Sequence, residues 1–307
     1  MCSPASFLLR PWATRCFFVF ALVAAGGITG CDKAQSDSIR LANLGKKAME
    51  RDDYREARIR FQEAVDVFPE NAKAHYGLGV SLIEFDELNQ ARKHLREASK
   101  LDATMTEAFY QLGVVALRDD KLDEAEQSLR KALEQQPDHS AAQYTFSLLL
   151  ERQGNIKDAE TALRRSIVLD PYQPAAFLQL ARLYTRVGAE GEAIAVLREG
   201  LRLCTDDKVE SAAQIAQLFN ELGILLQQAG RYTESIEALT KAIRLPGATP
   251  EIVFNLGWAH ASNGEVQSAL SYFNQYIELA EPNNPAVRIA TNVARHLRQR
   301  LTADSDG

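Results

Sequence analysis

The residues of this chain that are best suited to chemistry are tyrosines at a regular spacing. Tyr76, Tyr110 and Tyr144 are each separated by 34 residues. A tyrosine offers a large contact area and one polar group, which suits a binding surface. The five histidines include no pair at i,i+3 or i,i+4, so no helical metal site is predicted. We therefore expect binding chemistry, with no catalytic residue, metal or cofactor.

A second chemical feature is a cysteine that follows a short apolar run near the start of the chain. Arg10 and Arg15 precede the run, and small residues follow it, which is the layout of a bacterial export signal. The run is about 13 residues long, shorter than the ~20 that span a membrane. Ile28-Thr29-Gly30-Cys31 resembles a lipobox, which implies cleavage before Cys31 and a palmitate-type lipid on it. A plain cleaved signal or an uncut anchor is the alternative.

These features predict where the protein resides. Residues 1–30 would be the signal peptide, and residues 31–37 the lipidated cysteine and a short tether. The protein would then be lipid-anchored in the cell envelope and face the periplasm. Asp32 directly follows the cysteine, which resembles an inner-membrane retention signal in some bacteria. That rule varies between bacterial groups, so the choice between inner and outer membrane stays open.

The 34-residue spacing also organises most of the chain. Leu44-Gly45, Leu78-Gly79 and Leu112-Gly113 stand in register, and Leu222-Gly223 and Leu256-Gly257 resume it after an insertion at 208–215. A fixed period of this length indicates a stack of small units instead of one compact core. Each unit has the pattern of two amphipathic helices. The predicted units are 38–71, 72–105, 106–139, 140–173, 174–207, 216–249 and 250–283.

Turn residues and small residues repeat with the same period. One turn position holds Asp52, Asp86, Asp120, Gly154, Gly188, Gly230 and Gly264 in successive units. Asp and Gly both suit the tight turn that ends a helix. Paired small residues twelve apart, such as Gly79 and Ala91, would let the two helices of a unit approach closely, where a larger side chain would overpack.

The pattern resembles the tetratricopeptide repeat. The resemblance rests on Leu-Gly in the first helix, Ala in the second, a large apolar residue four positions later, and closing prolines such as Pro69 and Pro137. It implies an all-α, right-handed superhelical solenoid of about seven helix-turn-helix units over 38–283. Residues 284–301 carry an apolar stripe that fits a terminal capping helix, and 302–307 are expected to be a disordered tail.

The resemblance also implies a binding surface, because in this family the first helix of each unit lines the concave groove. The predicted groove residues are Tyr76, Val80, Tyr110, Val114, Tyr144, Leu148, Arg182, Asn220, Phe254 and Trp258. The aromatic side chains would anchor a protein or peptide partner, or they would pack between adjacent first helices; both interpretations stay open. Lys46 and Lys73 are too few to predict the clamp with which some members hold a terminal carboxylate.

The charge balance narrows the function further. The formal net charge is -6, which argues against nucleic-acid binding because that requires a basic patch. We expect no small-molecule substrate. The favoured hypothesis is a non-catalytic, membrane-anchored scaffold, engaged in the assembly of a pilus or secretin type of envelope machine. The alternative is an accessory or regulatory subunit of a periplasmic cell-wall hydrolase, or an enzyme whose site is hidden in the repeats.

Overall fold

The computed structural model describes residues 17–204 and 212–305, with side chains placed for 32–204 and 212–302. These residues form fifteen α-helices and no strand. The helices are α1 Phe17–Met49, α2 Tyr54–Val67, α3 Ala72–Glu84, α4 Leu88–Leu101, α5 Thr106–Arg118, α6 Leu122–Gln135, α7 Ser140–Arg152, α8 Ile156–Leu169, α9 Pro174–Arg186, α10 Glu190–Cys204, α11 Ala212–Gln228, α12 Tyr232–Ile243, α13 Pro250–Ser262, α14 Val266–Leu279 and α15 Pro285–Ser305.

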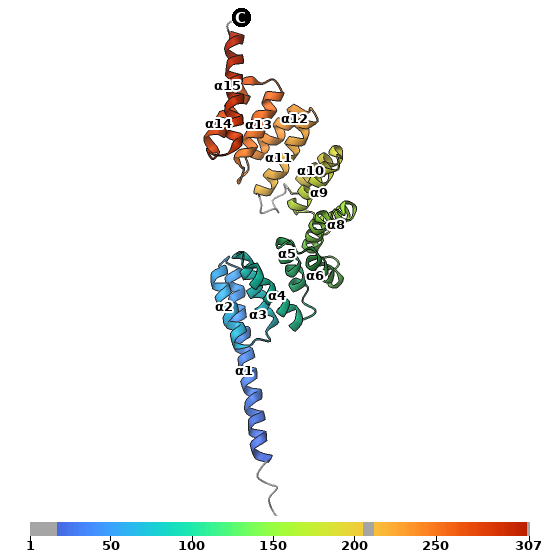
Figure 1. The fold of residues 1–307 in the computed structure, drawn as a ribbon, viewed down its shortest axis with the longest axis vertical. Helices are drawn as coiled ribbons and strands as arrows, with labels where there is room; N and C mark the ends of the chain where they lie inside the picture. The colour runs from blue at the N-terminus through green and yellow to red at the C-terminus, as the bar shows by residue number, and fades with distance from the viewer. Residues whose placement is uncertain (1–16, 205–211, 306–307) are drawn as a thin grey trace, which may run out of the picture. The chain divides into compact units, whose positions relative to one another are not determined.

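The chain divides after Pro137 into two compact units. The first contains the hairpins α1/α2, α3/α4 and α5/α6 (Figure 1). The second contains four hairpins, from α7/α8 to α13/α14, and α15, which packs on α14. Each hairpin also packs on the next one within its unit. The predicted all-α class, a solenoid of helical hairpins, is confirmed.

The turn between the two helices of each hairpin has the same backbone conformation throughout. Its central residue has a positive φ in all seven hairpins, between 55° and 81°. The residues are Asp52, Asp86, Asp120, Gly154, Gly188, Gly230 and Gly264. Glycine adopts this left-handed conformation without strain, and aspartate tolerates it better than most residues. The turn position predicted from the repeat is therefore confirmed in every hairpin.

The helices of a hairpin meet where the repeat places its small residues. A Cβ atom added to Gly79 would lie 2.7 Å from Leu95, and one added to Gly113 would lie 2.5 Å from Leu129. Both leucines are fully buried. The missing side chain of each glycine therefore makes room for the leucine of the following helix, which confirms the role predicted for the small residues.

The two ends of the repeat array differ from the expectation. Residues 31–37, predicted as a tether, belong to α1, where each residue spans about 1.5 Å instead of the ~3.3 Å of an extended chain. Residues 302–305, predicted to be disordered, continue α15 to Ser305, because no Pro or Gly interrupts the helix there. Within the range that the structure covers, no helix is both long enough and apolar enough to span a bilayer.

Two predictions lie wholly or partly outside the described residues. Residues 1–16 of the predicted signal peptide are outside them, as are the side chains up to Cys31. The insertion predicted at 208–215 is described only from residue 212. From that residue onward it belongs to α11, which runs from Ala212 to Gln228.

Candidate partner-binding surfaces

The predicted groove residues lie on the first helices of the hairpins, four in the first unit and six in the second. All are half-buried except Arg182, which is exposed. Tyr76 and Val80 lie on α3, Tyr110 and Val114 on α5, Tyr144 and Leu148 on α7, Arg182 on α9, Asn220 on α11, and Phe254 and Trp258 on α13. We call the face formed by these helices in each unit its first-helix surface.

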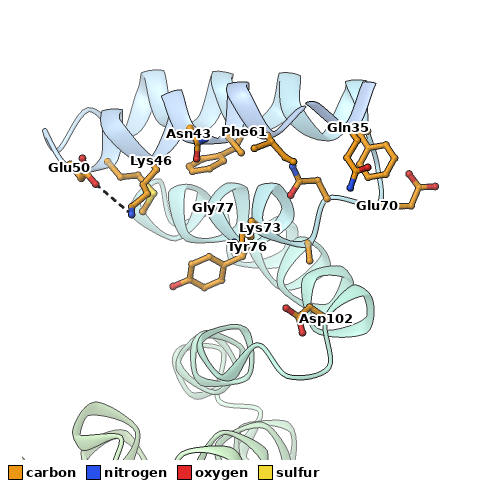
Figure 2. A pocket seen from close by; sticks show the side chains of 16 residues that line it. Gln35, Asn43, Lys46, Glu50, Phe61, Glu70, Lys73, Tyr76, Gly77 and Asp102 are labelled. Atoms are coloured by element: carbon orange, nitrogen blue, oxygen red, sulfur yellow. Dashed lines mark ion pairs between the residues drawn. The ribbon is translucent and has the colours of Figure 1, made fainter. Parts of the chain in front are cut away.

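The first-helix surface of the first unit contains a pocket of about 740 Å³ between α1 and α3. Figure 2 shows the residues that line it, among them Asn43 and Lys46 on α1 and Lys73 and Tyr76 on α3. Ile39, Ala42 and Met49 add apolar surface from α1, and Phe61 from α2. We call it the α1/α3 pocket. Of the ten predicted groove residues, only Tyr76 lines it.

The ring of Phe61 forms the base of the α1/α3 pocket. It fits there because two neighbouring residues, Gly45 and Gly77, have no side chain. A Cβ atom would lie 3.0 Å from this ring at Gly45 and only 2.3 Å from it at Gly77. Gly77 departs from the repeat pattern, because the other six repeats carry polar residues at the same position. These are Asn43, Gln111, Thr145, Gln179, Glu221 and Asn255. The phenylalanine at 61 and the glycine at 77 therefore fit one another.

A further departure from the repeat leaves the α1/α3 pocket open. Tyr76 stands three residues before Gly79, and Tyr110 three before Gly113; the residue in that position before Gly45 is Ala42. Ala42 is buried but has no ring. The equivalents of Val80 and Ile83 in α1 are Lys46 and Met49, and both line the pocket. The sequence prediction missed these residues, although their offsets from Gly45 could have identified them.

Tyr76 connects the α1/α3 pocket to the next first helix. Burial raises the pKa of its hydroxyl, the negative charge of Glu107 and the hydroxyl of Tyr110 raise it further, and a hydrogen bond with Gln111 lowers it. All three partners belong to α5. The ring of Tyr76 thus borders the pocket, while its hydroxyl interacts with residues around Tyr110.

The first-helix surface of the second unit is polar, and its side chains bond to one another. The Glu151 carboxylate on α7 accepts a hydrogen bond from Gln179 on α9 at 2.5 Å. Arg182 on α9 pairs with Glu221 on α11 at 2.9 Å. Asn255 on α13 donates to Asn220 on α11 at 2.9 Å. The predicted groove residues Arg182 and Asn220 are therefore engaged inside the chain.

The aromatic residues of α13 also pack inside the second unit. Phe254 lies 4.9 Å from Tyr276 and 5.8 Å from Phe273, measured between ring centroids. Trp258 lies 5.5 Å from Phe273 in an edge-to-face arrangement, a favourable geometry for aromatic pairs. Trp258 borders a smaller pocket of about 340 Å³ with polar neighbours such as Asn255. At α13 the aromatic side chains therefore pack mainly against other side chains of the chain, and only part of Trp258 borders a pocket.

Reactive groups lie away from these surfaces. His75 and His94 meet across the α3/α4 hairpin with their Nδ1 atoms 3.0 Å apart, and burial lowers the pKa of both. The spacing rule for one helix could not find this pair. Burial raises the pKa of the Cys204 thiol to about 11, which makes it unreactive. Among the described residues, no three His, Cys, Asp or Glu side chains are grouped to hold a metal ion.

Comparison with known proteins agrees with the hairpin geometry. The family model of the tetratricopeptide repeat matches residues 43–106, 81–140, 110–174, 144–208 and 220–284, well over half of the chain. The photosystem I assembly protein Ycf3 of Rippkaea orientalis is 34% identical over 83 residues, which cover 26% of this chain and 46% of that protein. The chain spans less than half the length of each curated relative that it matches.

Solved structures show the same fold at low sequence identity. The structure of pilF from Pseudomonas aeruginosa has a TM-score of 0.59 and 18% identity to this chain. The match covers 75% of this chain and 97% of that chain. A tetratricopeptide repeat protein from Parabacteroides merdae gives 0.58 and 15%, covering 86% and 99%. The APC/C hetero-tetramer Cut9-Hcn1 gives 0.59 and 16%, covering 87% and 54%. These likenesses concern the fold alone.

Proposed function

Because the chain belongs to the tetratricopeptide repeat family, we propose that it is a non-catalytic scaffold that binds a protein or peptide partner. The contact is made on the first-helix surface of the first unit. The observation that carries the proposal is the α1/α3 pocket, which combines buried apolar surface with a few polar groups at its mouth. Recognition sites in proteins typically have this composition.

The same surface in the second unit supports the choice of the first unit. In the second unit, Arg182 and Asn220 already pair with side chains of neighbouring helices. A partner would have to exchange these contacts for its own, so each new polar contact would replace one that the chain already makes. The α1/α3 pocket demands no such exchange, because its base and walls are largely apolar.

The cellular part of the proposal rests on the sequence. Lipid attached at Cys31 anchors the protein in the cell envelope, where it faces the periplasm, and Asp32 favours the inner membrane. The scaffold serves the assembly of an envelope machine of the pilus or secretin type. An assembly role is in keeping with the similarity to the photosystem I assembly protein of Rippkaea orientalis.

Site-specific photo-crosslinking in living cells tests the binding function. A photoreactive amino acid replaces Val80 or Lys46 on the first-helix surface of the first unit, or Arg165 on the exposed side of α8 as the control. We expect a discrete crosslinked partner from Val80 and Lys46 and none from Arg165. Equal crosslinking from all three positions, or none from any, would reject a first-helix binding surface.

Labelling with a palmitate analogue tests the anchor separately. We expect label on the natural chain and none on Cys31→Ser, which should move from the membrane to the soluble fraction. Fractionation of Asp32→Ser then distinguishes the membranes, since loss of inner-membrane retention should move the protein to the outer membrane. An unlabelled but membrane-bound natural chain would instead indicate an uncut anchor.

A further inference from the structure

We propose that the α1/α3 pocket receives one aromatic side chain of the partner, and that basic residues flank this side chain in the partner's sequence. This inference rests on the proposed function and specifies the partner's chemistry. It follows from two observations about the pocket. The first is a ring that the next three repeats carry, as Tyr76, Tyr110 and Tyr144, and the first repeat does not. The second is the distribution of charge at the pocket mouth.

The missing ring is defined by the repeat itself. In α3 and α5, the position three residues before the glycine of the repeated Leu-Gly pair carries Tyr76 and Tyr110. In α1 the same position carries Ala42, and the pocket opens beside it. A tyrosine in place of Ala42 would direct its ring toward Tyr76, as Tyr76 directs its own toward Tyr110. The space that this unit leaves empty is therefore suited to an aromatic ring.

The walls of the pocket fit a ring better than an aliphatic chain. Phe61 forms the base and Tyr76 one side, while Ile39 and Met49 provide aliphatic and sulfur contacts. Aromatic rings gain from edge-to-face and offset contacts with other rings, and from contact with a methionine sulfur. The pocket also has room for the main chain beside the ring, where Asn43 offers an amide donor and acceptor.

The charges at the mouth of the pocket favour a basic neighbour. Lys46 pairs with Glu50 at 3.9 Å, and hydrogen bonds from Thr104, followed by the charge of Lys73, lower the pKa of Asp102. The lining carries two lysines against three carboxylates, Glu50, Glu70 and Asp102. Among the described residues, Glu70 and Glu107 form no ion pair within 4.0 Å, and both are exposed. Glu70 lines the pocket, and Glu107 acts on Tyr76. Glu70, just before α3, is therefore a carboxylate without an ion pair at the mouth, and Glu107 on α5 adds a second negative charge beside Tyr76.

Capped synthetic peptides are the probes for this proposal. The reference probe is an acetylated and amidated heptapeptide of glycines, with a central tryptophan between two lysines. Matched probes replace the tryptophan with leucine or alanine, or the lysines with glutamates. Binding to the full chain in detergent is followed by the fluorescence of the tryptophan or by calorimetry. We expect alanine to weaken binding at least about tenfold, leucine less, and glutamates severalfold, with the lysine effect shrinking as salt is raised.

Variants of the protein locate the effect. Ala42→Tyr restores the missing ring and should reduce binding of the tryptophan probe at least about tenfold. Arg165→Tyr adds the same ring on the exposed side of α8, away from the first-helix surfaces, and should leave binding unchanged. Should Ala42→Tyr fold poorly, Glu70→Lys and Glu107→Lys provide a second test on exposed positions. They should remove the preference for lysine over glutamate.

Several results would overturn the inference. One is equal binding of the tryptophan and alanine probes, and another is tighter binding of a probe with a free terminal carboxylate, which would assign Lys46 and Lys73 to that group. A change of oligomeric state in Ala42→Tyr would show that a second copy of the chain occupies the pocket. Crosslinking at Val80 that survives Ala42→Tyr would reject this inference but keep the proposed function, whereas loss of all crosslinking in the natural chain rejects both.

Discussion

The first-helix surfaces of the two units use the same repeat positions in opposite ways. In the first unit, Ala42 takes the place of a ring, and the neighbouring surface opens into a pocket. In the second unit, Phe254 takes that place and packs against Phe273 and Tyr276. The backbone repeat is the same, so the difference comes from side chains alone. A repeat position can therefore supply its own ring or leave the space for another molecule.

Polar residues show the same contrast. The second unit joins its first helices laterally, through Arg182 with Glu221 and Asn255 with Asn220. In the first unit one of the three residues equivalent to Asn255 is Gly77, which admits the ring of Phe61 in place of a lateral hydrogen bond. A surface with internal hydrogen bonds gains little from a partner, because each new bond replaces an existing one. This comparison predicts that the first unit is the binding unit and that the second is mainly structural.

The largest expected effect is the loss of the aromatic cluster in the second unit. Phe273→Ala removes a fully buried ring that contacts both Phe254 and Trp258, and should destabilise that unit by about 3–5 kcal/mol. Phe61→Ala should cost less, because one side of this ring faces the α1/α3 pocket. Urea unfolding followed by hydrogen exchange in each unit measures both changes. Equal losses would show that the pocket is not an open space in solution.

The next effect concerns the glycine that admits Phe61. Gly77→Ala would place a Cβ atom 2.3 Å from a buried ring, so the ring has to move, at a cost of about 1–3 kcal/mol. Gly191→Ala provides the control, because nothing lies within 4 Å of its Cβ and its φ is not left-handed. Gly191 lies in α10, where alanine is favoured over glycine, so this change should not destabilise the protein. Chemical denaturation should therefore rank Gly77→Ala as the more harmful, and the reverse order would contradict the fit of Phe61 and Gly77.

The sequence predicted the features that depend on the period. The period located the turn at seven positive-φ residues and the close approach of two helices at Gly79 and Ala91, because agreement between the repeats reveals both features. The α1/α3 pocket arises where one unit departs from the others, at Ala42, Phe61 and Gly77. A pattern averaged over seven units hides such departures. The pairing of His75 with His94 was also hidden, because it depends on how two helices face one another.

A smaller effect separates the turns of the two units. The first unit uses Asp52, Asp86 and Asp120 at positive φ, and the second unit uses glycine at every equivalent turn. Asp86→Gly should stabilise the first unit by about 0.5–1 kcal/mol, because glycine adopts the left-handed conformation without strain. Gly188→Asp should destabilise the second unit by a similar amount. Thermal or urea unfolding measures both. A loss of stability in Asp86→Gly would show that the aspartate side chain contributes a bond that outweighs the strain.

The smallest expected effect is a dependence of stability on pH in the α3/α4 hairpin of the first unit. His75 and His94 lie in contact there. The equivalent residues of the next hairpin, Phe109 and Ser128, do not titrate near neutral pH. Burial lowers the pKa of both imidazoles; the carbonyl of Pro69 and the charge of Glu97 oppose this at His75, and Lys93 reinforces it at both. The folded unit therefore prefers the neutral rings.

The sign of this dependence follows from the lowered pKa values. An unfolded histidine has a pKa of about 6.5, so the pair contributes its full stability above that pH and loses it as the pH falls toward the lower folded values. Hydrogen exchange in α3 and α4 should accelerate, relative to the intrinsic rate, between pH 7.5 and 5.5, while α9 and α10 should not. The double variant His75→Phe with His94→Ser gives this hairpin the residues of the α5/α6 hairpin. It should abolish the difference in pH dependence between α3/α4 and α9/α10. Persistence of the pH effect in this variant would assign it to other groups.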